Sequence, residues 1–140
     1  MRAITFFLLS AFIVILELNA QVTEYAFEQK NLTYSEITGG TVLWSGTFDN
    51  EVSGAITIPS FTFDGVAYTS VYVTANGFVT FGIAPSATNY TPISNSASYT
   101  GAISAFGRDL IQAETGSPPI RYQQVGNEFV IQWKDVRRKT

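Results

Sequence analysis

The 140-residue chain contains neither cysteine nor histidine. Without cysteine it has no disulfide framework and no thiol nucleophile. Without both residue types, the Ser-His-Asp triad, the imidazole base and the usual zinc and iron sites are excluded. A two-carboxylate glycosidase needs only Asp and Glu, but most of these residues fall in expected turns or surface positions. We therefore expect a chain that is not an enzyme, with no catalytic residues and no cofactor.

Long apolar runs are also scarce, and the single one lies at the N-terminus. The run Ala3–Leu16 follows one basic residue and would reach only about 21 Å as a helix, short of a membrane core of roughly 30 Å. This pattern predicts a signal peptide over residues 1–20, cleaved between Ala20 and Gln21, with an uncleaved anchor as the alternative. We expect one domain over 21–140, secreted or at the cell surface, with no membrane span in the mature chain. Export without cysteine favours a bacterial source.

Charge is low, with 14% charged residues and a net charge of −3, so nucleic acid is not an expected partner. The basic residues gather near the end, at Lys134, Arg137, Arg138 and Lys139. One interpretation is a basic tail for an anionic partner. We favour the other, a solvated strand end followed by a loop.

Beyond the leader, short runs rich in Val, Ile, Thr, Phe and Tyr recur between turn residues, and helical periodicity is absent. The pattern predicts an all-β chain folded as an antiparallel two-sheet β-sandwich. The expected strands are Tyr25–Gln29, Leu32–Glu36, Thr41–Trp44, Ala55–Ile58, Phe61–Phe63, Val66–Tyr68, Ser70–Thr74, Phe78–Gly82, Gly101–Phe106, Ile120–Val125 and Glu128–Lys134.

Two dipeptides, Asp64-Gly65 and Gly126-Asn127, have the composition of two-residue hairpin turns and so predict strand register. The predicted pairs are Phe63 with Val66, Phe61 with Tyr68, Gln124 with Phe129, Tyr122 with Ile131 and Ile120 with Trp133. One face of the second hairpin is then buried. The other is predicted to be wet and holds Arg121, Gln123, Val125, Glu128, Val130 and Gln132.

A third dipeptide, Asn76-Gly77, is the strongest hairpin signal in the chain. A two-residue turn there places Val71, Val73, Ala75, Phe78 and Thr80 on one face, and Tyr72, Thr74, Val79 and Phe81 on the other. Both faces are apolar, which predicts a central position in a sheet. The segment Ile83–Tyr99 is the expected cover of the second face.

Three segments, Ser70–Gly82, Ala102–Leu110 and Ile120–Val136, together resemble the nidogen-like β-sandwich. With YAFEQ at Tyr25–Gln29, and with Thr38–Asn50 and Ala55–Ser70, they more closely resemble the N-terminal modules of bacterial proteins exported by type IX secretion. The resemblance implies a structural role for Asn76, Gly77, Arg108, Asp109 and Trp133, and the export machinery as a partner. Asp109 is expected to accept backbone N–H bonds or to pair with Arg108.

The same resemblance implies further strands after Thr140, so we expect a truncated chain. In that case the strand Glu128–Lys134, or its neighbour, has an unpaired edge.

Two sets of residues are candidate ligand sites. Asp49, Asn50 and Glu51 form a short acidic loop whose oxygens could bind calcium, although Asp-Asn is also ordinary turn chemistry. Trp44 and Tyr90 are the aromatic residues least explained by the predicted core, and exposed rings of this kind stack on sugars. Binding surfaces are expected on the loops Thr47–Ser53 and Ile83–Tyr99.

The sequence as a whole therefore predicts a non-catalytic extracellular module for adhesion or for binding a protein or glycan partner at the cell surface. The alternative is the accessory domain of a secreted protease or glycosidase whose catalytic part lies beyond residue 140.

Overall fold

A computed structural model describes residues 28–93, 99–114 and 120–140. The predicted signal peptide and its cleavage site lie outside the described residues, as does most of the predicted strand Tyr25–Gln29. The chain divides into two units, Met1–Tyr34 and Ser35–Thr140. Described residues of the first unit form no strand and include an exposed ion pair of 3.1 Å between Lys30 and Glu28. The predicted strand Leu32–Glu36 is wrong, since these residues form no strand.

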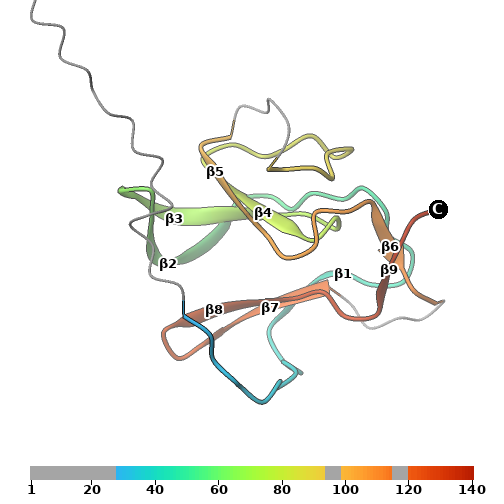
Figure 1. The fold of residues 1–140 in the computed structure, drawn as a ribbon, viewed down its shortest axis with the longest axis horizontal. Coiled ribbons are helices and arrows are strands. Elements are labelled where there is room, and N and C mark those ends of the chain that lie inside the picture. The colour runs from blue at the N-terminus through green and yellow to red at the C-terminus, as the bar shows by residue number, and fades with distance from the viewer. Residues whose placement is uncertain (1–27, 94–98, 115–119) are drawn as a thin grey trace, which may run out of the picture. The chain divides into compact units, whose positions relative to one another are not determined.

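Among the described residues of the second unit, the regular secondary structure consists of β-strands only, and every strand pairing is antiparallel. The strands are β1 (Thr41–Trp44), β2 (Ile56–Phe63), β3 (Val66–Val73), β4 (Phe78–Phe81), β5 (Gly101–Ser104), β6 (Leu110–Gln112), β7 (Ile120–Val125), β8 (Glu128–Gln132) and β9 (Val136–Arg138). They form sheets of order β1-β7-β8, β2-β3-β4-β5 and β6-β9 (Figure 1). The part of the chain described holds no helix long and apolar enough to cross a membrane. The all-β antiparallel sandwich is confirmed.

The four-stranded sheet begins with two strands that are longer than predicted. β2 joins the two expected strands Ala55–Ile58 and Phe61–Phe63 into one. Pro59, which cannot donate a backbone hydrogen bond, lies at a register shift between Thr57 and Phe61, so the strand continues past it. The turn to β3 has positive φ at both central residues, 50° at Asp64 and 73° at Gly65, as a type I′ turn requires. The predicted pairs of this hairpin are found as expected, Phe63 with Val66 and Phe61 with Tyr68.

The register predicted for the β3-β4 hairpin is wrong by one residue. Val73 pairs with Val79, and the Thr74 amide donates to the Phe78 carbonyl at 3.0 Å, leaving a three-residue loop. Gly77 takes the left-handed conformation at φ 76°, as such loops commonly do. The shift turns Val79 and Phe81 to the face that also carries Val71 and Val73. The central position is confirmed, since β3 and β4 are interior strands of their sheet.

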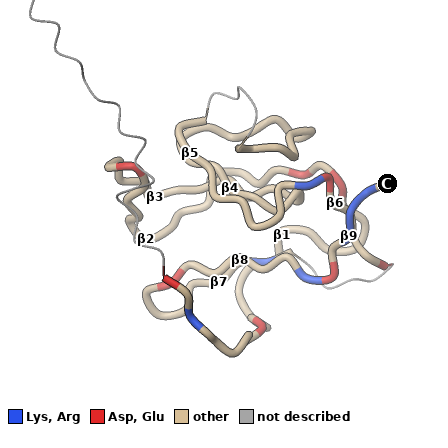
Figure 2. Tube along the Cα trace, in the orientation of Figure 1, with Lys and Arg blue, Asp and Glu red and all other residues tan. Residues whose placement is uncertain are grey.

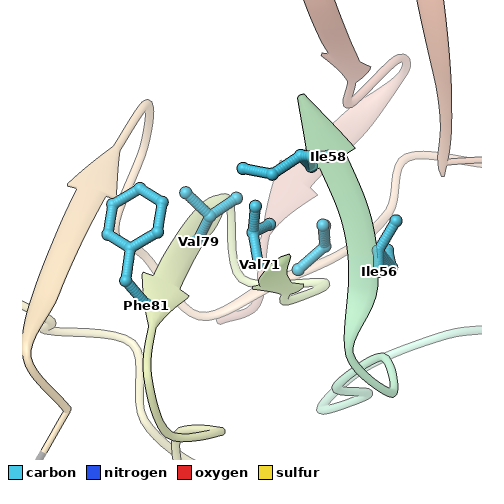
Figure 3. Close-up of a cluster of buried hydrophobic side chains, with 6 residues drawn as sticks. Ile56, Ile58, Val71, Val79 and Phe81 are labelled. Carbon is cyan, nitrogen blue, oxygen red and sulfur yellow. The ribbon is translucent and has the colours of Figure 1, made fainter. Parts of the chain in front are cut away.

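The main core lies on this face (Figure 3). Its buried members are Ile56, Ile58, Val71, Val73, Val79 and Phe81. Side chains of the three-stranded sheet and its flank pack against them, including Tyr122, Phe129, Ile131 and Trp133. This contact makes the two larger sheets a sandwich.

The three-stranded sheet confirms the Gly126-Asn127 turn. Tyr122 pairs with Ile131 and Gln124 with Phe129, and Gly126 has a φ of 59°. The predicted pair of Ile120 with Trp133 lies beyond the ladder, because β8 ends at Gln132.

The outer face of this hairpin is less exposed to solvent than predicted. Gln132 is only 7% exposed because the segment at Ile37 lies over it. The Ile37 amide donates to Gln132 Oε1 at 3.0 Å, and Gln132 Nε2 donates to the Ile37 carbonyl at 3.5 Å. A chain segment that forms no strand thus covers part of the sheet.

The small β6-β9 sheet has no counterpart among the predicted strands. Leu110 pairs with Arg138 and Gln112 with Val136, so most of the predicted basic loop is in fact strand β9. The Lys139 amide extends the contact by donating to the Asp109 carbonyl at 2.8 Å. Figure 2 shows this end of the unit, where the basic residues of β9 lie beside acidic residues.

Candidate functional site

An apolar groove of about 600 Å³ lies between the two larger sheets, beside β8. Its lining combines the inner face of the four-stranded sheet with residues 127–131 of the β7-β8 hairpin. The residues are Ile58, Pro59, Ser60, Phe61, Val71, Val79, Phe81, Ile103, Asn127, Glu128, Phe129, Val130 and Ile131.

The groove is open because the two sheets differ in width. β8 is the last strand of a three-stranded sheet, while the facing sheet has four strands. Two large apolar side chains that line the groove are therefore left partly in water, with Phe61 40% exposed and Ile103 46% exposed. Such exposure in a concave apolar surface is typical of a binding site.

Neither candidate ring for sugar stacking lies in the groove lining. Trp44 is partly buried and packs against both clusters of buried hydrophobic residues. The expectation that Trp44 is not part of the core is therefore wrong. Tyr90 is 45% exposed on the long loop after β4. The structure therefore leaves Tyr90 as the ring of the two that is more available for stacking.

The three calcium candidates, Asp49, Asn50 and Glu51, all have partners within the protein. The Asp49 carboxylate pairs with the Lys139 ammonium, and Glu51 Oε2 accepts the Asp49 amide at 2.6 Å. Asn50 Oδ1 accepts from Asn76 Nδ2 at 3.4 Å. Among described residues, no group of three or more acidic side chains is placed to hold a metal ion. These oxygens thus organise the loop itself.

Two carboxylates lie close to the Lys139 ammonium. The hydrogen bond that Lys139 donates to the Asp49 carboxylate raises the pKa of Lys139 above its ordinary value, and the charges of Asp49 and Asp109 add to this effect. One oxygen of each carboxylate, Asp49 Oδ1 and Asp109 Oδ1, is buried without a hydrogen-bond partner. We predicted that the Asp109 carboxylate accepts backbone N–H bonds, but its Oδ1 atom accepts none. The backbone carbonyl of Asp109 instead accepts the Lys139 amide.

Asn76 joins three segments of the chain. Its side chain is fully buried; Oδ1 accepts the Leu110 amide at 2.9 Å and Nδ2 donates to the Asn89 carbonyl at 3.3 Å. The Arg108 amide donates to the Asn76 carbonyl at 3.3 Å. Asn76 therefore fixes the β3-β4 loop to the segment before β6 and to the long loop after β4.

The remaining structural candidates, Gly77 and Trp133, each contact a segment that lies far from them in the sequence. A Cβ built on Gly77 would meet the side chain of Phe106 at 2.8 Å, so only glycine fits there. Trp133 Nε1 donates to the Thr74 carbonyl at 2.8 Å. Sequence reasoning named these structural residues but missed the groove. The one signal for it was the predicted open edge at β8.

Comparison with known protein families identifies a match. The family model described as "NIDO related" matches residues 24–140. No curated protein and no solved structure matches the chain. Because the matched region covers most of the chain and includes the whole sandwich, the chain belongs to the NIDO-related family.

Proposed function

We propose that this chain is a non-catalytic extracellular module that binds a protein or glycan partner in a secreted or cell-surface bacterial protein. The family match over residues 24–140 carries the proposal. The open apolar groove beside β8 supports partner binding, because two of its large apolar side chains, Phe61 and Ile103, are 40% and 46% exposed.

The export route is part of the same proposal. The N-terminal apolar run favours a signal peptide cleaved after Ala20, and the segments after it resemble modules of proteins exported by type IX secretion. The experiment is to express the chain with its own leader in a bacterium that has this machinery. We expect an exported chain that begins at Gln21 by mass spectrometry of its N-terminal peptide. A chain retained in the cytoplasm would overturn the extracellular assignment.

The nature of the partner can be tested separately. The exported chain is applied to a glycan array beside the variants Tyr90→Ala and Trp44→Ala. A signal lost in Tyr90→Ala supports a glycan partner that stacks on the exposed ring. No signal for the wild type removes the glycan and leaves a protein partner. Because Trp44 packs in the core, Trp44→Ala needs a thermal melt to show that it is still folded.

A further inference from the structure

Among the residues that the structure describes, no strand pairs with the outer backbone edge of β8. β8 is the last strand of its sheet, and its ladder with β7 closes at Val125 opposite Glu128 across a two-residue turn. The closing pair of such a hairpin exchanges both backbone hydrogen bonds, and bonded and non-bonded pairs then alternate. Val130 therefore bonds to β7, whereas Phe129 and Ile131 direct their N–H and C=O groups away from β7. A strand arriving from outside would meet these groups.

The groove borders this same edge. Five consecutive residues, 127–131, line it. Side chains alternate between the two faces of a strand, so one face alone would supply only every second residue to the lining. Since consecutive residues line the groove, the backbone edge of β8 itself faces it. The side chains of Phe129 and Ile131 pack inward against the core. Residues placed directly opposite them on an added strand would point inward too, into the groove.

A second copy of the chain does not fit as the occupant. Its own β8 offers Phe129 and Ile131 as inward side chains, but these already pack against its own core. Two β8 edges could join their backbones and would still leave both grooves empty. A strand whose alternate apolar side chains are free to enter fits the groove better.

Charge narrows the chemistry of the occupant. Glu128 is the one charged residue in the groove lining. Like charges directly opposite each other on neighbouring strands are destabilising, so an acidic residue beside Glu128 is disfavoured. A neutral or basic residue suits that position.

We propose that β8 and the groove bind one extended peptide strand of a partner protein, antiparallel to β8. The strand carries apolar residues opposite Phe129 and Ile131, and a neutral or basic residue beside Glu128. Its backbone pairs with the free edge, and its alternate side chains cover Phe61 and Ile103, which are now partly in water. The inference rests on the proposed partner-binding function and names the chemistry of the partner.

The test uses a fluorescently labelled peptide of alternating valine and threonine with a lysine at each end. We expect saturable binding to the exported chain by fluorescence anisotropy. A peptide of the same composition with its valines in one block should bind at least tenfold more weakly, because every second valine of the block then points away from the groove. A peptide N-methylated on its pairing amides should lose binding to the same extent.

Two matched variants locate the site. Ile103→Lys places a charge in the groove, whereas Val42→Lys changes a residue of the same 46% exposure on β1, the far edge strand of the three-stranded sheet. We expect Ile103→Lys to weaken peptide binding at least tenfold and Val42→Lys to change it by less than twofold. Ile103→Thr, a smaller change, should give an intermediate loss. Thermal melts show that each variant is folded.

Several outcomes would overturn the proposal. These are no peptide binding by the folded wild type, equal binding of the N-methylated peptide, and equal loss in both lysine variants. A dimer in light scattering that the peptide does not dissociate would assign the edge to a second copy. None of these results affects the export and glycan experiments, so failure of the strand proposal is distinguishable from failure of the proposed function.

Discussion

The indole Nε1 of Trp133 donates a hydrogen bond of 2.8 Å to the backbone carbonyl of Thr74. Trp133 follows β8 of the three-stranded sheet, and Thr74 follows β3 of the facing sheet. Thr74 is 1% exposed, so water cannot easily replace the indole as donor. One side chain thus connects the two layers of the sandwich by packing and by a polar contact.

Trp133→Phe should keep most of the packing and remove the donor. A buried acceptor left unsatisfied costs about 1–3 kcal/mol, so we expect a loss of unfolding free energy of about 2 kcal/mol in urea titrations. The control is Tyr68→Phe, which removes an exposed hydrogen bond of 2.8 Å to Thr100. We expect that variant to lose less than about 0.5 kcal/mol. Equal losses in the two variants would contradict the role of the Trp133 contact.

Asn76→Asp should destabilise the unit more at neutral pH than at pH 4. The Nδ2 donor to the Asn89 carbonyl becomes an oxygen, which repels that acceptor in a fully buried site. Burial disfavours the ionised carboxylate, so its pKa in the folded state is raised and the penalty grows as pH rises above about 4. We expect a loss of about 3 kcal/mol at pH 7, from urea titrations at both pH values.

The matched control is Asn127→Asp, in the exposed turn between β7 and β8. This variant should show little change at either pH. A pH-independent loss in Asn76→Asp would show that shape, and not charge, decides the site.

Gly77→Ala and Gly65→Ala separate backbone strain from steric contact. Both glycines have similar positive φ, 76° at Gly77 and 73° at Gly65. A Cβ at Gly65 meets nothing within 4 Å, whereas at Gly77 it meets Phe106 at 2.8 Å. We expect Gly65→Ala to lose about 1 kcal/mol from strain alone. Gly77→Ala should lose at least about 2 kcal/mol more from overpacking, measured by urea unfolding.

The Lys139 ammonium should titrate above its ordinary pKa. The hydrogen bond that it donates to the Asp49 carboxylate favours the charged form in the folded state. A raised folded pKa means that, while the Asp49 carboxylate is ionised, the ion pair stabilises the fold fully at pH values below the unfolded pKa of 10.5. The stabilisation is then lost as pH rises through the higher, folded pKa.

Heteronuclear NMR of the lysine side chains measures this titration directly. Asp49→Asn should lower the pKa of Lys139 toward its ordinary value. The interaction should weaken with added salt, because both side chains are partly exposed. A titration of Lys139 that is the same in the wild type and in Asp49→Asn would count against the ion pair.

Local turn chemistry predicts two of the hairpins correctly. At Asp64-Gly65 and Gly126-Asn127 the chain needs positive φ within a two-residue loop, and nothing distant interferes. At Asn76-Gly77 distant contacts decide the register. The Leu110 amide binds the Asn76 side chain, and the Phe106 amide donates to the Gly77 carbonyl at 3.0 Å. Such contacts leave no trace in a local pattern.

The parts of the candidate site that sequence missed also depend on distant pairing. β6 and β9 have three residues each and find each other across the β7-β8 hairpin, so neither shows a usable period. The groove exists because the facing sheets have unequal numbers of strands, which depends on strand order. Phe61 and Ile103 come from opposite ends of the four-stranded sheet, and no spacing along the chain joins them.

The strand order also bears on how the domain folds. β2, β3 and β4 are joined by short turns, and so are β7 and β8, so these pairings close small loops. β1 and β7 pair with each other, but the strands of the whole four-stranded sheet lie between them in the sequence. Their pairing therefore closes a long loop. Since distant contacts form late, β1 is expected to dock last and to detach first during native-state fluctuations. The β7-β8 hairpin, which carries the open edge, would survive that detachment.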